Sequence, residues 1–245
     1  MLKGFWKLTW VETKVFVREP MGVIGSLVIP VILFVVLGRS YGLGGPSTAP
    51  LPPFNVAILA ALFIAIGAAL SLVAIISIYR EGGILKRLRA TPLSPVTILS
   101  SHVFVKLVFT AISLGLLVVA GRRIFPGAMQ VGVVSFTGAV LLSTVSILSL
   151  GFVIASMVPT ARFAQPIGAS VLYPMVTISG LFFPLDRMPA VLRGIAKVLP
   201  TTHAVALMEG VWDGSGWGAH LGDAAALVVI AAACIALSTR VFRWE

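Results

Sequence analysis

Charged residues are scarce in this chain of 245 residues: only 11% are Asp, Glu, Lys or Arg, whereas 58% are hydrophobic. A soluble domain carries roughly 25% charged residues. A water-soluble globule of this length would therefore lack the polar surface needed to cover its core. No long polar stretch interrupts the sequence, which predicts one membrane domain over residues 1–245 without a soluble appendage.

Groups with catalytic or metal-binding chemistry are also few. The single cysteine, Cys234, lies in an apolar run and has no disulfide partner within the chain. The three histidines stand near the ends of apolar runs, no H-E-x-x-H motif occurs, and the eight carboxylates are scattered. We therefore expect no enzyme, no catalytic residue, no metal and no cofactor in this chain. The alternatives from another class are an intramembrane enzyme or a structural scaffold, and the enzyme would have to use weak candidates such as Ser215 and His203.

The net charge of +10 is the one feature that suggests nucleic acid. In so hydrophobic a chain, cations are instead expected at the membrane edges, where they orient the protein and contact anionic lipids. We expect membrane lipids, and no nucleic acid, as partners.

Six apolar runs are long enough to cross a bilayer, whose core of about 30 Å requires about 20 helical residues. They lie near residues 21–38, 54–78, 102–121, 129–157, 166–184 and 219–239. The sequence thus predicts an all-α integral membrane protein with six transmembrane helices. Lys106 and Asp223 stand about one turn inside two of these runs. We expect Lys106 to snorkel to the interface and Asp223 to face protein or water.

The lysines and arginines are unevenly divided between the two sides of the membrane. With the N-terminus in the cytoplasm, twelve of the 18 lie inside, and six lie outside. The outer six are Arg39, Arg122, Arg123, Arg187, Arg193 and Lys197. The positive-inside rule then places both termini in the cytoplasm.

Titratable groups are missing from the middles of the six runs, where an ion-coupled transporter would need them. No GxxxxGK[ST] motif is present, so a P-loop cannot supply ATP energy within this chain. Uphill transport would need an external energy source. Hydroxyls in the fourth run, from Ser135 to Ser149, either line a pathway or bond backbone carbonyls. Gly67 and Ser71 form a small-xxx-small pair suited to close helix contact.

Three segments outside the runs show a pattern of their own. Residues 1–19 place basic residues beside an aromatic face, which predicts an interfacial amphipathic helix. Residues 79–101 form a basic loop, broken by Gly82–Gly83, that either sets topology or docks a partner. Residues 185–218 suit two short helices, one ended by Pro200 and the next capped by Thr202. This external re-entrant hairpin would help to close an outward exit.

The basic loop reads REGGILKRLRATPLS from Arg80 to Ser94. It resembles the first cytoplasmic loop of the type-2 permeases of ATP-binding-cassette (ABC) exporters, with Ile84 where threonine is common. A second match, FPLD from Phe183 followed by LPTTHA from Leu199, resembles the proline-rich segment before the last span of that family. The loop looks most like that of drug-resistance permeases of the daunorubicin type.

The resemblance implies a permease subunit in a bacterial or archaeal plasma membrane, paired with a second copy and two copies of a separate ATPase that binds ATP and Mg. It implies export of an amphipathic drug-like or lipid-like substrate, or alternatively of a lipid-linked glycan. The ATPase-coupling residues, in a cytoplasmic coupling helix, would be Glu81, Gly82, Gly83, Lys86, Arg87, Leu88, Arg89, Thr91, Pro92, Leu93 and Ser94. The external gate would comprise Phe183, Pro184, Pro189, Pro200 and Thr202. The pathway or dimer candidates are Gly67, Ser71, Tyr173 and Pro174.

Overall fold

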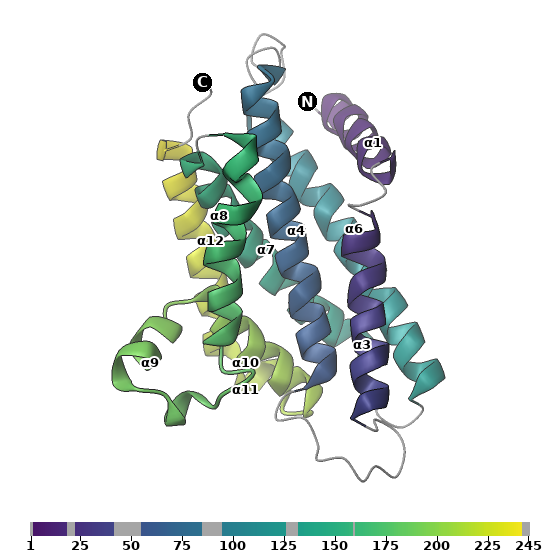
Figure 1. The fold of residues 1–245 in the computed structure, drawn as a ribbon, viewed down its shortest axis with the longest axis vertical. Helices are drawn as coiled ribbons and strands as arrows, with labels where there is room; N and C mark the ends of the chain where they lie inside the picture. Colours follow the sequence, from purple (N-terminus) through teal and green to yellow (C-terminus); the bar gives the residue numbers. More distant parts are fainter. Residues whose placement is uncertain are drawn as a thin grey trace.

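A computed structural model describes residues 2–18, 23–41, 55–84, 95–125, 132–158 and 160–241. These described residues form helices and turns, with no strand among them. Figure 1 shows longer helices running along the long axis, with α1 (Leu2–Arg18) across one end. The short helices α9 (Ala190–Ala196), α10 (Pro200–Trp212) and α11 (Gly216–Ala219) lie at the other end. The expected all-α membrane fold is confirmed.

The longer helices are those expected to span the membrane. They are α3 (Ile29–Ser40), which continues the π-helix η1 (Ile24–Val28), then α4 (Val56–Glu81), α6 (Pro95–Ile124), α7 (Val133–Met157), α8 (Ala161–Thr177) and α12 (Leu221–Val241). Among the described residues, four segments are long and apolar enough to cross a membrane: Val56–Glu81, Ser100–Ile124, Val133–Met157 and Leu221–Ser238. The apolar helix Ile24–Ser40 is shorter, and α8 has 17 residues. Six crossings therefore remain a prediction.

Two predicted spans differ clearly from the observed helices. The fifth span was expected over 166–184, but α8 ends at Thr177, and the chain turns at Gly180 with a φ of 97°. That left-handed conformation favours glycine and interrupts a helix. The third span was expected from residue 102, whereas α6 already begins at Pro95, directly after the predicted helix-start residue Ser94.

The helices α4 and α7 form the centre of the bundle, and two thirds of each apolar segment (67%) is buried, against 22% for α12. Glycine allows their close approach: a Cβ added at Gly151 would lie 3.4 Å from the Ala69 carbonyl oxygen. A Cβ at Gly168 of α8 would lie 2.9 Å from Leu70 Cδ2, whereas one at Gly67 would meet nothing within 4 Å. Within the chain, the close helix contact predicted at Gly67 thus occurs at Gly151 and Gly168 instead.

Pro30 explains the π-helical turn at the start of α3. Its ring nitrogen has no hydrogen to donate to the carbonyl four residues earlier, that of Ser26, and its ring crowds that carbonyl. The Ser113 hydroxyl of α6 donates to the Ser26 oxygen at 2.8 Å. The carbonyl that Pro30 leaves without its helical donor is therefore satisfied by the neighbouring helix.

Two short helices lie in the segment predicted to form the hairpin, but their boundaries differ from the predicted ones. α9 ends at Ala196, and Pro200 is the first residue of α10 rather than the end of the helix before it. A proline fits there because the first helical position needs no N–H donor. Leu199, not Thr202, is the N-cap, and the buried Thr202 hydroxyl finds no hydrogen-bond partner among the described residues. The predicted capping role of Thr202 is wrong.

The hydroxyls of the fourth predicted span bond their own helix. Ser143 donates to the Ala139 carbonyl at 2.8 Å, and Thr144 donates to the Val140 carbonyl at 2.7 Å. Both side chains are buried in the centre of the bundle. Of the two interpretations left open by the sequence, the backbone-bonding one fits these residues.

Candidate functional site

The basic loop begins at the end of α4, where the side chains of Arg80 and Glu81 cross to the α7–α8 turn. Arg80 donates from Nη1 to the Ala155 carbonyl at 3.2 Å and from Nη2 to the Val158 carbonyl. Glu81 Oε2 accepts the backbone N–H of Ala161 at 2.8 Å, at the start of α8. A carboxylate is favourable there because the first N–H groups of a helix lack internal acceptors. These contacts join the end of α4 directly to the end of α7 and the start of α8.

The two glycines end α4 as predicted. The Gly82 N–H donates to the Ile78 carbonyl at 2.9 Å, and the Gly83 N–H donates to the Arg80 carbonyl at 3.1 Å. Gly83 has a φ of 65°, the left-handed conformation that commonly follows a helix. The other predicted coupling residues lie outside the described part of the chain: Lys86, Arg87, Leu88, Arg89, Thr91, Pro92, Leu93 and Ser94.

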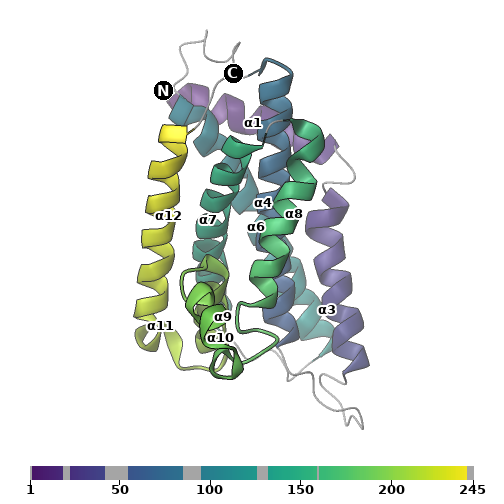
Figure 2. The same ribbon diagram turned by 60° about the vertical axis from the view of Figure 1, so that its left-hand side comes forward.

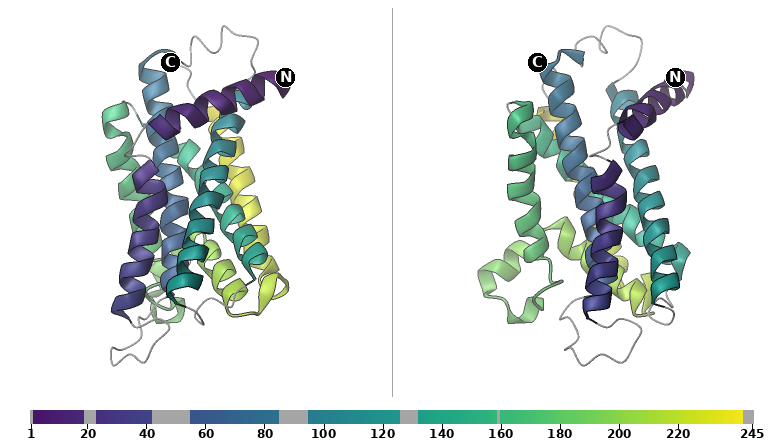
Figure 3. Two further views of the ribbon diagram at one scale, coloured as in Figure 1. Left: turned by 90° about the vertical axis from the view of Figure 1, so that its right-hand side faces the viewer. Right: turned by 45° about the vertical axis from the view of Figure 1, so that its right-hand side comes forward.

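A buried carboxylate joins α1 to α4 and α6. Glu12 of α1 is 6% exposed, accepts the Tyr79 hydroxyl at Oε1 (3.0 Å), and has Oε2 3.2 Å from His102 Nδ1. Burial raises the pKa of Glu12, while the Tyr79 hydrogen bond and the charge of Lys106 act in the opposite direction. These contacts hold α1 across the end of the bundle, as Figure 3 shows in side view.

Lys106 does not snorkel, so that prediction is wrong. Its side chain is 7% exposed, and Nζ lies 2.6 Å from Ser71 Oγ and 4.3 Å from the centroid of the Phe16 ring. Ser71 of α4 and Phe16 of α1 lie beside Lys106 and supply these partners within the bundle. The Lys106 ammonium group therefore has partners inside the bundle and does not extend to the surface.

These groups surround a cavity of about 270 Å³ between α1, η1, α4 and α6, which Gln165 of α8 also borders. Its polar lining consists of Glu12, Ser26, Ser71, His102, Lys106 and Gln165. The pathway candidates Gly67 and Ser71 both line it. The other two, Tyr173 and Pro174, are exposed on α8, where the Tyr173 ring lies 6.4 Å from that of Phe63. The four candidates therefore form two separate pairs.

A second hollow, of about 650 Å³, lies beside the 3-10 turn η2 (Leu185–Arg187) and α9. The predicted gate residues Phe183, Pro184 and Pro189 line it, together with Thr177, Ile178, Phe182, Arg187, Met188 and Leu192. The gate candidates Pro200 and Thr202 are buried at the start of α10 and are not part of this lining. The structure therefore brings three of the five predicted gate residues together.

Arg193 of α9 binds the backbone of the segment that lines this hollow. Its Nε donates to the Leu185 carbonyl at 3.0 Å, and its Nη2 donates to the carbonyls of Asp186 at 2.6 Å and Met188 at 3.1 Å. One guanidinium thus satisfies three carbonyls of an irregular segment. This arrangement fixes the turn after α8.

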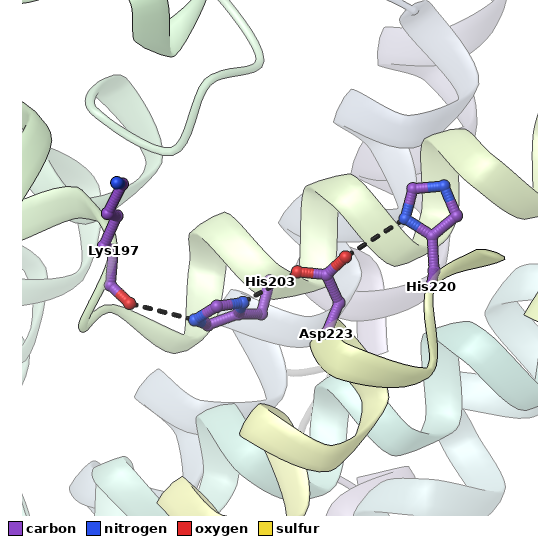
Figure 4. Close-up of polar contacts among 4 residues, drawn as sticks. All are labelled: Lys197, His203, His220 and Asp223. Atoms are coloured by element: carbon purple, nitrogen blue, oxygen red, sulfur yellow. Dashed lines mark hydrogen bonds and ion pairs between the residues drawn. The ribbon is translucent and has the colours of Figure 1, made fainter.

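A carboxylate also joins the short helices to α12 (Figure 4). Asp223 Oδ1 lies 2.8 Å from His203 Nδ1, and Oδ2 lies 3.1 Å from His220 Nδ1. His203 Nε2 lies 3.0 Å from the Lys197 carbonyl oxygen. The expectation that Asp223 faces protein is confirmed. Figure 2 places this end of the bundle opposite α1.

Among the described residues, no group of three His, Cys, Asp or Glu is placed so that it could hold a metal ion. Ser215, the weak nucleophile candidate, donates its hydroxyl to the Gly210 carbonyl at 2.9 Å. The arrangement is that of a helical bundle with a polar junction at each end.

The ABC-2 type transporter family model matches residues 3–211, from α1 to the end of α10. The chain belongs to the ABC-2 type transporter family. A comparison with curated proteins finds no match. Membership makes this chain the membrane component of a transporter and confirms the family that the REGG loop and the LPTTHA segment indicated. In this ABC-2 chain, the Arg80 and Glu81 contacts connect the end of α4 to the end of α7 and the start of α8.

Sequence analysis missed three residues of the junction at α1: Glu12, Tyr79 and His102. A signal was available for the first, because Glu12 stands four residues before Phe16 and seven after Phe5, on the apolar face of the helix. A carboxylate on such a face needs a buried partner. The identity of that partner depends on how α4 and α6 pack, which the sequence pattern does not show.

Proposed function

We propose that this ABC-2 chain is the permease subunit of an ATP-driven exporter that moves an amphipathic, drug-like or lipid-like substrate out of the cytoplasm or inner leaflet. Two copies would assemble with two copies of a separate ATPase, which binds ATP and Mg. The family match over residues 3–211, joined to the coupling-type loop at the end of α4, carries this proposal.

The two hollows support an amphipathic substrate. Both have mostly apolar walls and one or more polar groups, with Lys106 in the first and Arg187 in the second. Binding sites for amphipathic molecules combine apolar walls with a few placed polar groups. The first hollow adjoins α1, and the second adjoins the short helices at the opposite end.

The charge distribution supports an orientation of the protein in the membrane. The excess of lysine and arginine at the α1 end favours a cytoplasmic position for α1 and the loop 79–101. The hairpin 185–218 would then face outward and act as the exit gate. The ATPase would dock at the α1 end and pull on α8 through the Arg80–Glu81 contacts.

Co-purification with the ATPase, combined with charge reversal, tests this function. In the double variant Arg87→Glu/Arg89→Glu, we expect loss of the ATPase from the purified complex and loss of substrate-stimulated ATP hydrolysis. The matched control is Arg122→Glu/Arg123→Glu, which reverses two adjacent exposed arginines at the far end of α6. That control should retain the ATPase. Normal assembly and hydrolysis in the first variant would refute the coupling role.

A further inference from the structure

The imidazole ring of His203 lies between two hydrogen-bond acceptors (Figure 4). Its Nδ1 is 2.8 Å from Asp223 Oδ1 of α12, and its Nε2 is 3.0 Å from the carbonyl oxygen of Lys197. A backbone carbonyl can only accept a hydrogen bond, so Nε2 carries a hydrogen. A carboxylate also only accepts, so Nδ1 carries a second hydrogen unless Asp223 is itself protonated. The two contacts together therefore hold one proton more than a neutral ring beside a carboxylate.

The second histidine on this carboxylate needs no extra proton. His220 Nδ1 lies 3.1 Å from Asp223 Oδ2, and a neutral imidazole has one N–H to donate there. Figure 4 shows the Lys197 carbonyl facing the His203 ring, while the side-chain amine of Lys197 points away from it. The additional proton is therefore required by the two contacts of His203.

The titratable groups around His203 come from the hairpin and from the helices packed against α10, which are α4, α7, α8, α11 and α12. The helix α7 carries no titratable side chain. Those of α4 lie at the opposite end of the bundle, where Tyr79 contacts α1 and Glu81 contacts the start of α8. At the hairpin end, the titratable residues of these elements besides His203 are Tyr173, Asp186, Arg187, Arg193, Lys197, Glu209, Asp213, His220 and Asp223.

The helix α9, which extends from the side of the bundle in Figure 1, is attached by polar contacts on both of its sides. Before it, Arg193 donates to three carbonyls of residues 185–188, and a guanidinium keeps its charge at every accessible pH. After it, Lys197 is the C-cap residue, whose carbonyl has no donor within the helix. His203 of α10 supplies that donor. One attachment is therefore permanent, and the other depends on a proton.

We propose that His203 and Asp223 form a proton-operated latch of the hairpin, closed while the pair holds its extra proton and released when the proton leaves. Histidine is the side chain whose charge ordinarily changes between about pH 5 and pH 8. The side chains of His203 and Asp223 are 20% and 27% exposed, so protons from the solvent reach them. After proton loss, the neutral ring has one N–H for two acceptors, and one contact is lost. That the latch senses the external pH rests on the proposed function, whereas its proton dependence does not.

Hydrogen exchange of the full chain in phosphatidylcholine nanodiscs tests the latch at about pH 5 and about pH 8, with labelling times scaled to the intrinsic exchange rate at each pH. We expect the amides of α9 and of residues 197–203 to exchange about threefold to tenfold faster at the higher pH, because one hydrogen bond is lost there. Scaled exchange that is the same at both pH values would overturn the proposal.

Asp223→Asn provides the sharpest variant. The asparagine amide can donate to Nδ1 of a neutral His203 ring and accept from His220, so the ring keeps both contacts without the extra proton. We expect slow exchange in α9 at both pH values. Fast exchange at the higher pH in this variant would contradict the latch. His203→Gln, which does not titrate at this position, should also show the same exchange at both pH values, and a response that persists in it would refute the role of His203.

The matched controls are His220→Gln and Glu209→Gln, each of which removes a titratable group of the hairpin end but leaves His203 between its two acceptors. Both should keep the pH response, and its loss in either control would assign the response to that residue and overturn the latch. If His203→Gln does not fold, Asp223→Asn decides. Exchange independent of pH in a chain that still co-purifies with the ATPase would refute the latch and leave the proposed function standing. The expected pH response in a chain that binds no ATPase would support the latch and refute that function.

Discussion

At the α1 end of the molecule, the Glu12 carboxylate contacts Tyr79 and His102, and at the hairpin end, the Asp223 carboxylate contacts His203 and His220 (Figure 4). The two junctions have the same design, in which one carboxylate joins side chains from two other positions. They differ in burial: the Glu12 side chain is 7% exposed and that of Asp223 is 27% exposed. The second junction is more open to bulk water, whereas the first borders the cavity beside α1.

This difference suits the two roles proposed for the ends. A largely buried junction, which joins α1 to α4 and α6 through the Glu12 contacts, makes α1 part of the rigid bundle. A junction that water can reach opens at lower cost, which suits the helices of an exit gate. The structure thus predicts a rigid coupling end and a more easily opened hairpin end.

The largest expected effect comes from Glu12→Ala. Removing this carboxylate takes away the nearby counter-charge of the buried Lys106 and the acceptor of the Tyr79 hydroxyl. We therefore expect the free energy of unfolding to fall by about 3–5 kcal/mol. Thermal unfolding of the purified protein in detergent measures this loss. Glu12→Gln keeps an acceptor for Tyr79 and should lose less. A Glu12→Ala protein as stable as the wild type would contradict the rigid junction.

Gly210→Ala should have the next largest effect, because a Cβ at this position would overlap the imidazole ring of His220. The ring must move and loses its contact with Asp223, for an expected cost of about 1–3 kcal/mol. Gly194→Ala in α9 is the control, since its added Cβ meets nothing within 4 Å. Thermal unfolding of both variants provides the comparison. If Gly210→Ala were as stable as Gly194→Ala, the His220 ring would be free to move away from Gly210 without cost.

A smaller effect is expected for Asp223→Ala. The pairs with His203 and His220 are partly open to water, so their loss should cost about 1 kcal/mol or less. We expect faster hydrogen exchange in α10 and the first turns of α12, and no change in α1. If Asp223→Ala is as destabilising as Glu12→Ala, the contrast between the two ends is wrong.

The smallest effect concerns Glu209 in α10. Burial, followed by the negative charge of Asp213, raises the pKa of Glu209, while His220 acts in the opposite direction. Because the folded pKa lies above the unfolded one, the folded state binds the proton more tightly, and the destabilisation at neutral pH is relieved as the pH falls through the folded pKa. Glu209→Gln should therefore raise the melting temperature most at pH 7 and less near pH 5. A rise in melting temperature that is the same at pH 7 and at pH 5 would contradict the raised pKa of Glu209.

Much of the architecture followed from residue patterns. The apolar runs identified the long helices, the Gly82–Gly83 pair predicted the end of α4, and the Ser94-Pro95 signal predicted the start of α6. These features depend on local chemistry. Turn and cap choices were less predictable, because Pro200 can end one helix or begin the next, and the structure uses it to begin α10.

The candidate sites were harder to predict because they depend on packing. The burial of Lys106 depends on the positions of Ser71 on α4 and Phe16 on α1. In the same way, Gly67 lines a cavity because no helix covers it, whereas Gly168 meets Leu70. Identical residue types thus take different roles according to which neighbours the fold supplies.

Cysteine cross-linking tests the central claim, that the α1 end meets the ATPase and the hairpin end faces outward. In a Cys234→Ala background, a thiol–amine cross-linker would be applied to Ile84→Cys and Val191→Cys, which replace side chains that are 36% and 75% exposed. The proposed function predicts that Ile84→Cys cross-links to the co-purified ATPase. It predicts that Val191→Cys does not, and that it reacts with a membrane-impermeant maleimide in intact cells. The reverse pattern would contradict the assignment of the two ends.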